Sequence, residues 1–170
     1  MNKRFFALPV AVLIVLSILA APVVAGTIRT EYEGLDIPVA PLSPGRQWVS
    51  EDGVLHIRGL REAYEDEVDD PRLCGDAVVT ANMNFHFADP PVFVYGRMWG
   101  TVRIDNDNGY WEGGWVGKRT ELQGHSYIRA VLHGHGDYEG LKARASYVRQ
   151  TPDPAAPFMV HGVFMEPGGD

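Results

Sequence analysis

The chain has 170 residues, a formal net charge of −7 and a single cysteine, with 22 acidic side chains against 15 basic ones. A chain this acidic lacks the positive surface that nucleic acid or an anionic membrane surface requires, and the lone Cys74 cannot form an internal disulfide. The length suits one domain with its own hydrophobic core. We therefore expect a single domain, no nucleic-acid partner, and stability that comes from the core.

Residues 1–25 have the pattern of a secretory signal peptide. Two basic residues precede an apolar run from residue 5 to residue 21, and small residues end at Ala25, where a signal peptidase could cut. The run is nearly long enough to cross a bilayer, so an uncleaved anchor is the alternative. Pro22 favours cleavage because it interrupts a helix. We expect a secreted or periplasmic protein that does not contact the membrane once the leader is removed.

After the leader, prolines and weak periodicity predict an extended arm or linker over residues 26–45, followed by one domain over residues 46–170. A strand is expected near Gln47 and another over residues 54–60, before an acidic, solvated loop over residues 65–71. Alternating apolar and polar residues predict six further strands, over residues 77–87, 92–104, 110–120, 125–133, 141–150 and 158–165.

The turns between these strands are rich in glycine. Asn108-Gly109 predicts a tight hairpin, because a type I′ turn needs positive φ at both central residues. About eight antiparallel strands in a domain of this size predict an all-β fold that closes into a small, calycin-like barrel. Repeated glycines inside long strands favour the barrel over an open sandwich, because coiled strands need places to bend.

Three motifs resemble ligand sites but lack a required part. The glycines at 134, 136 and 140 do not have dinucleotide-binding spacing, and an alternating strand follows them instead of a helix. The segment 105–109 resembles part of a calcium loop. With Gly109 at the sixth position of that loop, the first and twelfth positions would be Ile104 and Trp115, and neither has the required carboxylate. His133 and His135 flank a glycine turn without a carboxylate at metal-binding spacing. We expect no metal ion and no cofactor.

The segment Tyr127-Ile-Arg-Ala-Val, followed by Gly134-x-Gly136-x-Tyr138-Glu-Gly140, resembles the strand, glycine-rich turn and strand of the allene oxide cyclase-like superfamily. That superfamily includes plant dirigent proteins and many uncharacterised bacterial secreted domains, and the resemblance covers residues 92–150. It implies an eight-stranded barrel with a central cavity, often within a homo-oligomer. Characterised members cyclise a fatty-acid epoxide or steer the coupling of phenolic radicals. Their lumen residues have no positional match here, so the resemblance assigns no catalytic residue.

Three functions remain open at this stage. The first is non-catalytic binding of a small, partly apolar molecule in the barrel, by an aromatic and polar set that comprises Trp99, Trp111, Trp115, Arg97, Asn82 and Asn84. The second is an isomerase or cyclase that shapes a hydrophobic substrate in the lumen, with Glu112 or His86 as acid or base. The third is an interaction module whose core is filled by side chains.

Overall fold

A computed structural model describes residues 26–89, 94–121 and 123–168, and the predicted signal peptide lies outside these ranges. The described residues form nine strands: β1 (Thr27–Ser43), β2 (Arg46–Val49), β3 (Leu55–Val68), β4 (Gly75–Phe87), β5 (Val94–Asn106), β6 (Gly109–Arg119), β7 (Ser126–Gly136), β8 (Lys142–Arg149) and β9 (Phe158–Pro167). These ranges contain no helix, and so none with the length and hydropathy needed to cross a membrane. The prediction of an all-β, antiparallel fold is confirmed.

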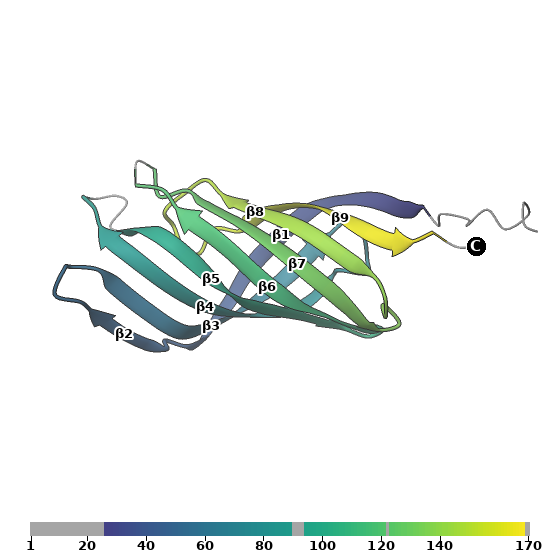
Figure 1. Cartoon of the computed structure of the whole chain (residues 1–170), viewed down its shortest axis with the longest axis horizontal. Coiled ribbons are helices and arrows are strands. Elements are labelled where there is room, and N and C mark those ends of the chain that lie inside the picture. The colour runs from purple at the N-terminus through teal and green to yellow at the C-terminus, as the bar shows by residue number, and fades with distance from the viewer. Residues whose placement is uncertain (1–25, 90–93, 122, 169–170) are drawn as a thin grey trace, which may run out of the picture.

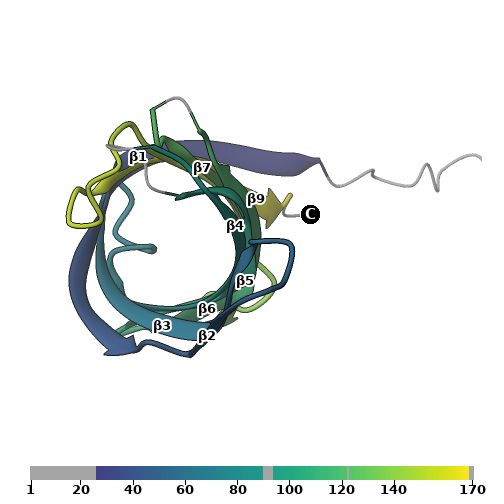
Figure 2. The same cartoon turned by 90° about the vertical axis from the view of Figure 1, so that its left-hand side faces the viewer.

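Eight of the strands form a closed, hydrogen-bonded ring (Figures 1 and 2). Neighbours along the chain pair from β3 through to β9, and β1 then pairs with β9 on one side and with β3 on the other. The short strand β2 pairs with the first half of β3, while β1 pairs with the second half. Consequently β1 and β2 follow one another along the same edge of β3.

The strand β1 corrects the prediction of an arm or linker over residues 26–45. It is a 17-residue strand and provides the hydrogen bonds that close the ring. Its pairing with β3 is irregular between Pro38 and Ala40 and again between Pro41 and Ser43. Proline has no N–H to donate, so it is tolerated where a ladder is interrupted by such irregularities. The prolines that suggested a linker therefore mark irregular positions within a strand.

The acidic segment over residues 65–71 is likewise only partly a loop, since β3 continues to Val68. Glu65 and Glu67 are exposed, whereas the intervening Asp66 is buried. The expected acidic loop thus contains a strand with period-two alternation. The sequence does not reveal this alternation, because acidic residues are expected to face solvent, whereas Asp66 points into the ring.

Glycines allow the strands to approach closely at the middle of the sheet. A Cβ atom at Gly100 would collide with the carbonyl oxygen of Thr80, and one at Gly113 would collide with the carbonyl oxygen of Val131.

The hairpin between β5 and β6 is present but lies one residue earlier than predicted. Asn106 pairs with Gly109, so Asp107 and Asn108 form the two-residue turn.

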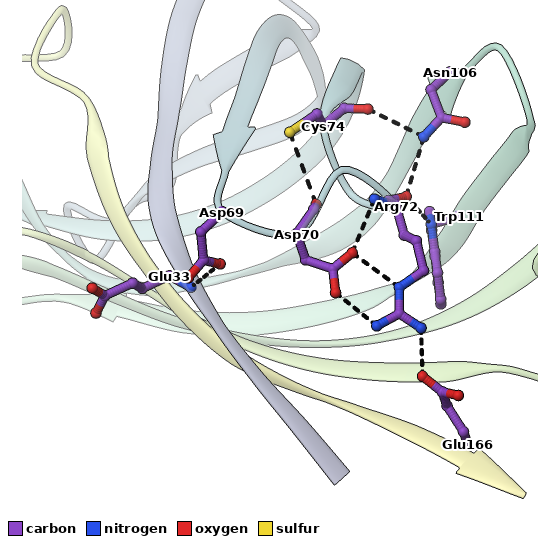
Figure 3. Close-up of polar contacts among 8 residues, drawn as sticks. All are labelled: Glu33, Asp69, Asp70, Arg72, Cys74, Asn106, Trp111 and Glu166. Atoms are coloured by element: carbon purple, nitrogen blue, oxygen red, sulfur yellow. Dashed lines mark hydrogen bonds and ion pairs between the residues drawn. The ribbon is translucent and has the colours of Figure 1, made fainter. Parts of the chain in front are cut away.

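One end of the ring is closed by the connection between β3 and β4, which folds inward (Figure 2). Leu73 in this connection is 3% exposed and packs with the core residues of the surrounding strands. Figure 3 shows how the connection is held: Arg72 binds the carboxylates of Asp70 and Glu166 through its guanidinium group. The carbonyl oxygen of Arg72 accepts a hydrogen bond of 2.7 Å from the indole of Trp111. This end is filled by packed side chains, and the cavity lies toward the other end.

Candidate ligand cavity

A cavity of about 100 Å³ lies inside the ring and is partly open to solvent. Much of its wall is apolar, with contributions from Ala81, Met83, Phe85, Met98, Trp115, Ile128 and Ala130. The rest of the wall is polar and comprises Asp36, Glu62, Tyr64, Arg119, Ser126, Tyr147 and Arg149. The cavity can therefore hold the apolar part of a molecule against one surface and bind a polar group at another.

Strand register brings several of the polar residues to one level of the ring. Ser126 on β7 pairs with Arg119 on β6 and with Arg149 on β8. Asp36 on β1 pairs with Phe158, the first residue of β9. Because alternate residues of a strand point to the same face, these inward positions form a row around the interior.

The two arginines are anchored by the loop that connects β8 to β9. Arg119 donates from Nη2 to the carbonyl oxygen of Pro152 at 2.7 Å, and Arg149 donates from Nη1 to that of Pro154 at 3.0 Å. The guanidinium group of Arg149 also lies 4.4 Å from the centre of the Phe158 ring. In each arginine the Nε atom is buried and has no hydrogen-bond partner among the described residues. Burial, and then the charge of Arg149, lower the pKa of Arg119.

Two carboxyl groups lie opposite each other where β1 pairs with β3. Asp36 pairs with Asp66, and the two residues are 7% and 4% exposed. Burial raises the pKa of Asp66 to about 7. Burial, and then the charge of Asp66, raise the pKa of Asp36 well above its usual range, while Arg149 lowers it. A carboxyl group in this environment is stabilised in its protonated form, which can donate a hydrogen bond.

Of the residues proposed from sequence for ligand binding, Trp115 lines the cavity. Trp111 is fully buried at the closed end, where it stacks on Tyr138 with ring centres 5.2 Å apart. The other four alternate with the inward residues of β4 and β5 and lie on the outer face of the sheet: Trp99, Arg97, Asn82 and Asn84. On that face the guanidinium group of Arg58 covers the Trp99 ring at 4.9 Å.

The two residues proposed as acid or base also lie outside the ring. His86 is exposed and packs against Tyr95, with ring centres 5.3 Å apart. Glu112 has a 52% exposed side chain and lies 3.4 Å from a ring nitrogen of His135. Neither side chain can reach a molecule bound inside the ring.

Sequence reasoning missed the polar residues that do line the cavity, although the pattern contained a signal for two of them. Arg149 shares a strand face with Ala143, Ala145 and Tyr147, all of which are buried. Arg119 shares the face of Trp111 and Trp115 on β6. A charged residue that continues an apolar alternation is a candidate for an inward position. Asp36 had no such signal, because its segment was predicted to be an arm.

Comparisons with known proteins add no functional assignment to this geometry. The chain matches no protein-family model. Searches of curated proteins and of solved structures also found no match.

Proposed function

We propose that the ring is a barrel of the allene oxide cyclase-like kind that binds a small, partly apolar molecule without chemical conversion. The observation that carries this proposal is a set of buried polar atoms without a hydrogen-bond partner among the described residues: Asp36 Oδ1, Arg119 Nε and Arg149 Nε. All three residues line the same cavity. Leaving such an atom unpaired costs roughly 1–3 kcal/mol, so these three residues mark the part of the wall where a polar group of a ligand would gain binding energy.

The cavity volume limits the enclosed part of the ligand. An apolar cavity of about 150 Å³ is known to hold benzene, and this one measures about 100 Å³. The enclosed body is therefore on the order of a single small ring or a short branched chain, and a larger ligand would extend through the opening. A cavity of this size favours ligand binding over the interaction module with a filled core.

Filling the cavity should prevent binding. Ala130 is 3% exposed and lines the apolar wall, so Ala130→Leu places three more carbon atoms in the space that the ligand needs. We expect at least a tenfold loss of affinity for any small molecule that the wild-type protein binds, measured by isothermal titration calorimetry.

Val131→Leu is the matched control, because Val131 is the next residue on β7 and is 45% exposed on the outer face. This variant should bind as the wild type does. Equal binding by wild-type protein and Ala130→Leu would place the ligand outside the cavity and contradict the proposal.

An isomerase or cyclase is the second candidate, and the environment of Asp36 favours it. This residue lines the cavity and is held toward its protonated form, as a general acid requires. Incubation of a bound ligand with the protein, followed by NMR spectroscopy of the released ligand, separates the two functions. The binding function predicts an unchanged ligand, whereas an isomerase predicts a product that Asp36→Asn no longer forms.

A further inference from the structure

Arg149, which is buried, and Arg119, which is half-buried, lack the counterions that such groups normally have in a protein interior. Among the described residues no carboxylate lies within ion-pair distance of Arg119 or Arg149, whereas Arg72 has two such partners. Each of the two cavity arginines is held by one backbone carbonyl group, which carries no net charge. Burying a guanidinium group without a counterion is costly, and two adjacent ones repel each other.

The neighbouring groups indicate which charge would fit. Arg119 and Arg149 contribute two positive charges, and Glu62 contributes one negative charge while accepting a hydrogen bond of 2.9 Å from Tyr64. Burial raises the pKa of Asp36, while the positive charge of Arg149 lowers it. Arg119 and Arg149 line one part of this wall and have no carboxylate within ion-pair distance among the described residues, so this part of the wall suits a small anionic group. The adjoining apolar wall excludes an ion that is polar on all sides.

We propose that the ligand is a small monocarboxylate with a compact apolar body, whose carboxylate accepts hydrogen bonds from the guanidinium groups of Arg119 and Arg149. A guanidinium group matches a planar carboxylate, and both arginines are already oriented by the β8–β9 loop. The apolar body would lie against Ala130, Met98 and Trp115. This inference rests on the proposed binding function and specifies the chemical class of the ligand.

Benzoate, benzamide, benzyl alcohol and phenyl phosphate are suitable probes, because they share one ring and differ in the charge and shape of the polar group. Calorimetry on the wild-type protein at pH 7 should show benzoate binding at least tenfold more tightly than each of the other three. Arg149→Gln and Arg119→Gln should each weaken benzoate binding by tenfold or more and leave benzyl alcohol binding nearly unchanged.

The control variants are Arg144→Gln and Arg129→Gln, which remove exposed arginines from β8 and β7. Both should bind benzoate as the wild type does. Equal binding of benzoate and benzyl alcohol would overturn the carboxylate assignment and leave the binding function intact, as would tighter binding of phenyl phosphate. Absence of binding by all four probes would overturn both. The probe comparison uses wild-type protein, so it remains decisive even if an arginine variant fails to fold.

Discussion

Replacing Trp111 with alanine should lower the free energy of unfolding by about 3–5 kcal/mol, the usual range for a buried aromatic residue. Trp111 has no exposed surface and lies between Tyr138 and Phe164, whose ring centres are 5.2 and 5.4 Å from its own. Its indole N–H also holds the carbonyl oxygen of Arg72, within the connection that closes the ring. The substitution therefore creates a cavity and removes one of the hydrogen bonds that the carbonyl oxygen of Arg72 accepts.

Trp48→Ala is the control for this prediction, because Trp48 lies on the short strand β2 and is 37% exposed. It should cost roughly 1 kcal/mol or less. Urea denaturation followed by circular dichroism measures both variants without relying on tryptophan fluorescence. Similar losses for the two would mean that the closed end of the ring is not a principal source of stability.

Stability should fall as the pH rises from about 4 to about 7. The pKa of Asp66 is raised from 3.8 to about 7 in the folded protein, so the folded state keeps a proton that the unfolded chain releases in this window. Each pKa unit corresponds to about 1.4 kcal/mol, which gives a loss on the order of 4 kcal/mol across the window. Asp36 adds to the loss, because its pKa is raised as well.

Asp70 changes the free energy of unfolding with pH in the opposite direction, because its pKa is lowered by its hydrogen bonds to Arg72. Its contribution is present above the unfolded pKa of 3.8 and is lost as the pH falls further. Together these groups place the stability maximum near pH 4, at about the unfolded pKa of the aspartates. Thermal or urea unfolding at a series of pH values measures this profile.

Asp66→Asn should flatten the decline between pH 4 and 7, because it removes one titrating carboxyl group and the charge that raises the pKa of Asp36. Glu67→Gln is the matched control, since Glu67 is the next residue on β3 and is exposed. It should keep the wild-type slope. A wild-type stability that rises between pH 4 and 7 would contradict the described burial of the two aspartates.

The same buried groups explain why the proposed site should cost stability. Like charges directly opposite each other on paired strands are normally unfavourable, as are buried charges without partners. Asp36 and Asp66 form such a pair when both are ionised, and Arg119 and Arg149 have no carboxylate within ion-pair distance among the described residues. Local arrangements that lower stability tend to concentrate at functional sites. This cost in stability supports a binding role for the polar residues of the cavity wall, among them Asp36, Arg119 and Arg149.

The strands with regular alternation could be predicted from sequence, and the irregular ones could not. Residues 77–87 alternate clearly because one face packs in the core and the other meets solvent, and β4 spans Gly75–Phe87. β1 was missed because Pro38 and Pro41 interrupt its pattern, and only long-range pairing with β3 and β9 makes it a strand. The tryptophans were proposed as ligand contacts because they are aromatic, yet the face on which each side chain lies depends on strand register. That is why Trp99 and Trp115 lie on opposite faces.

The methionine methyl groups provide the most direct test of binding inside the ring. Met83 and Met98 line the cavity, whereas Met159 is 48% exposed on β9. Protein labelled with ¹³C at the methionine methyl groups can be titrated with benzoate and, separately, with benzyl alcohol while NMR spectra are recorded. The proposed function predicts saturable shifts of the Met83 and Met98 signals, with the Met159 signal unchanged. Saturable shifts confined to Met159, or no shift of the Met83 and Met98 signals with either probe, would contradict it.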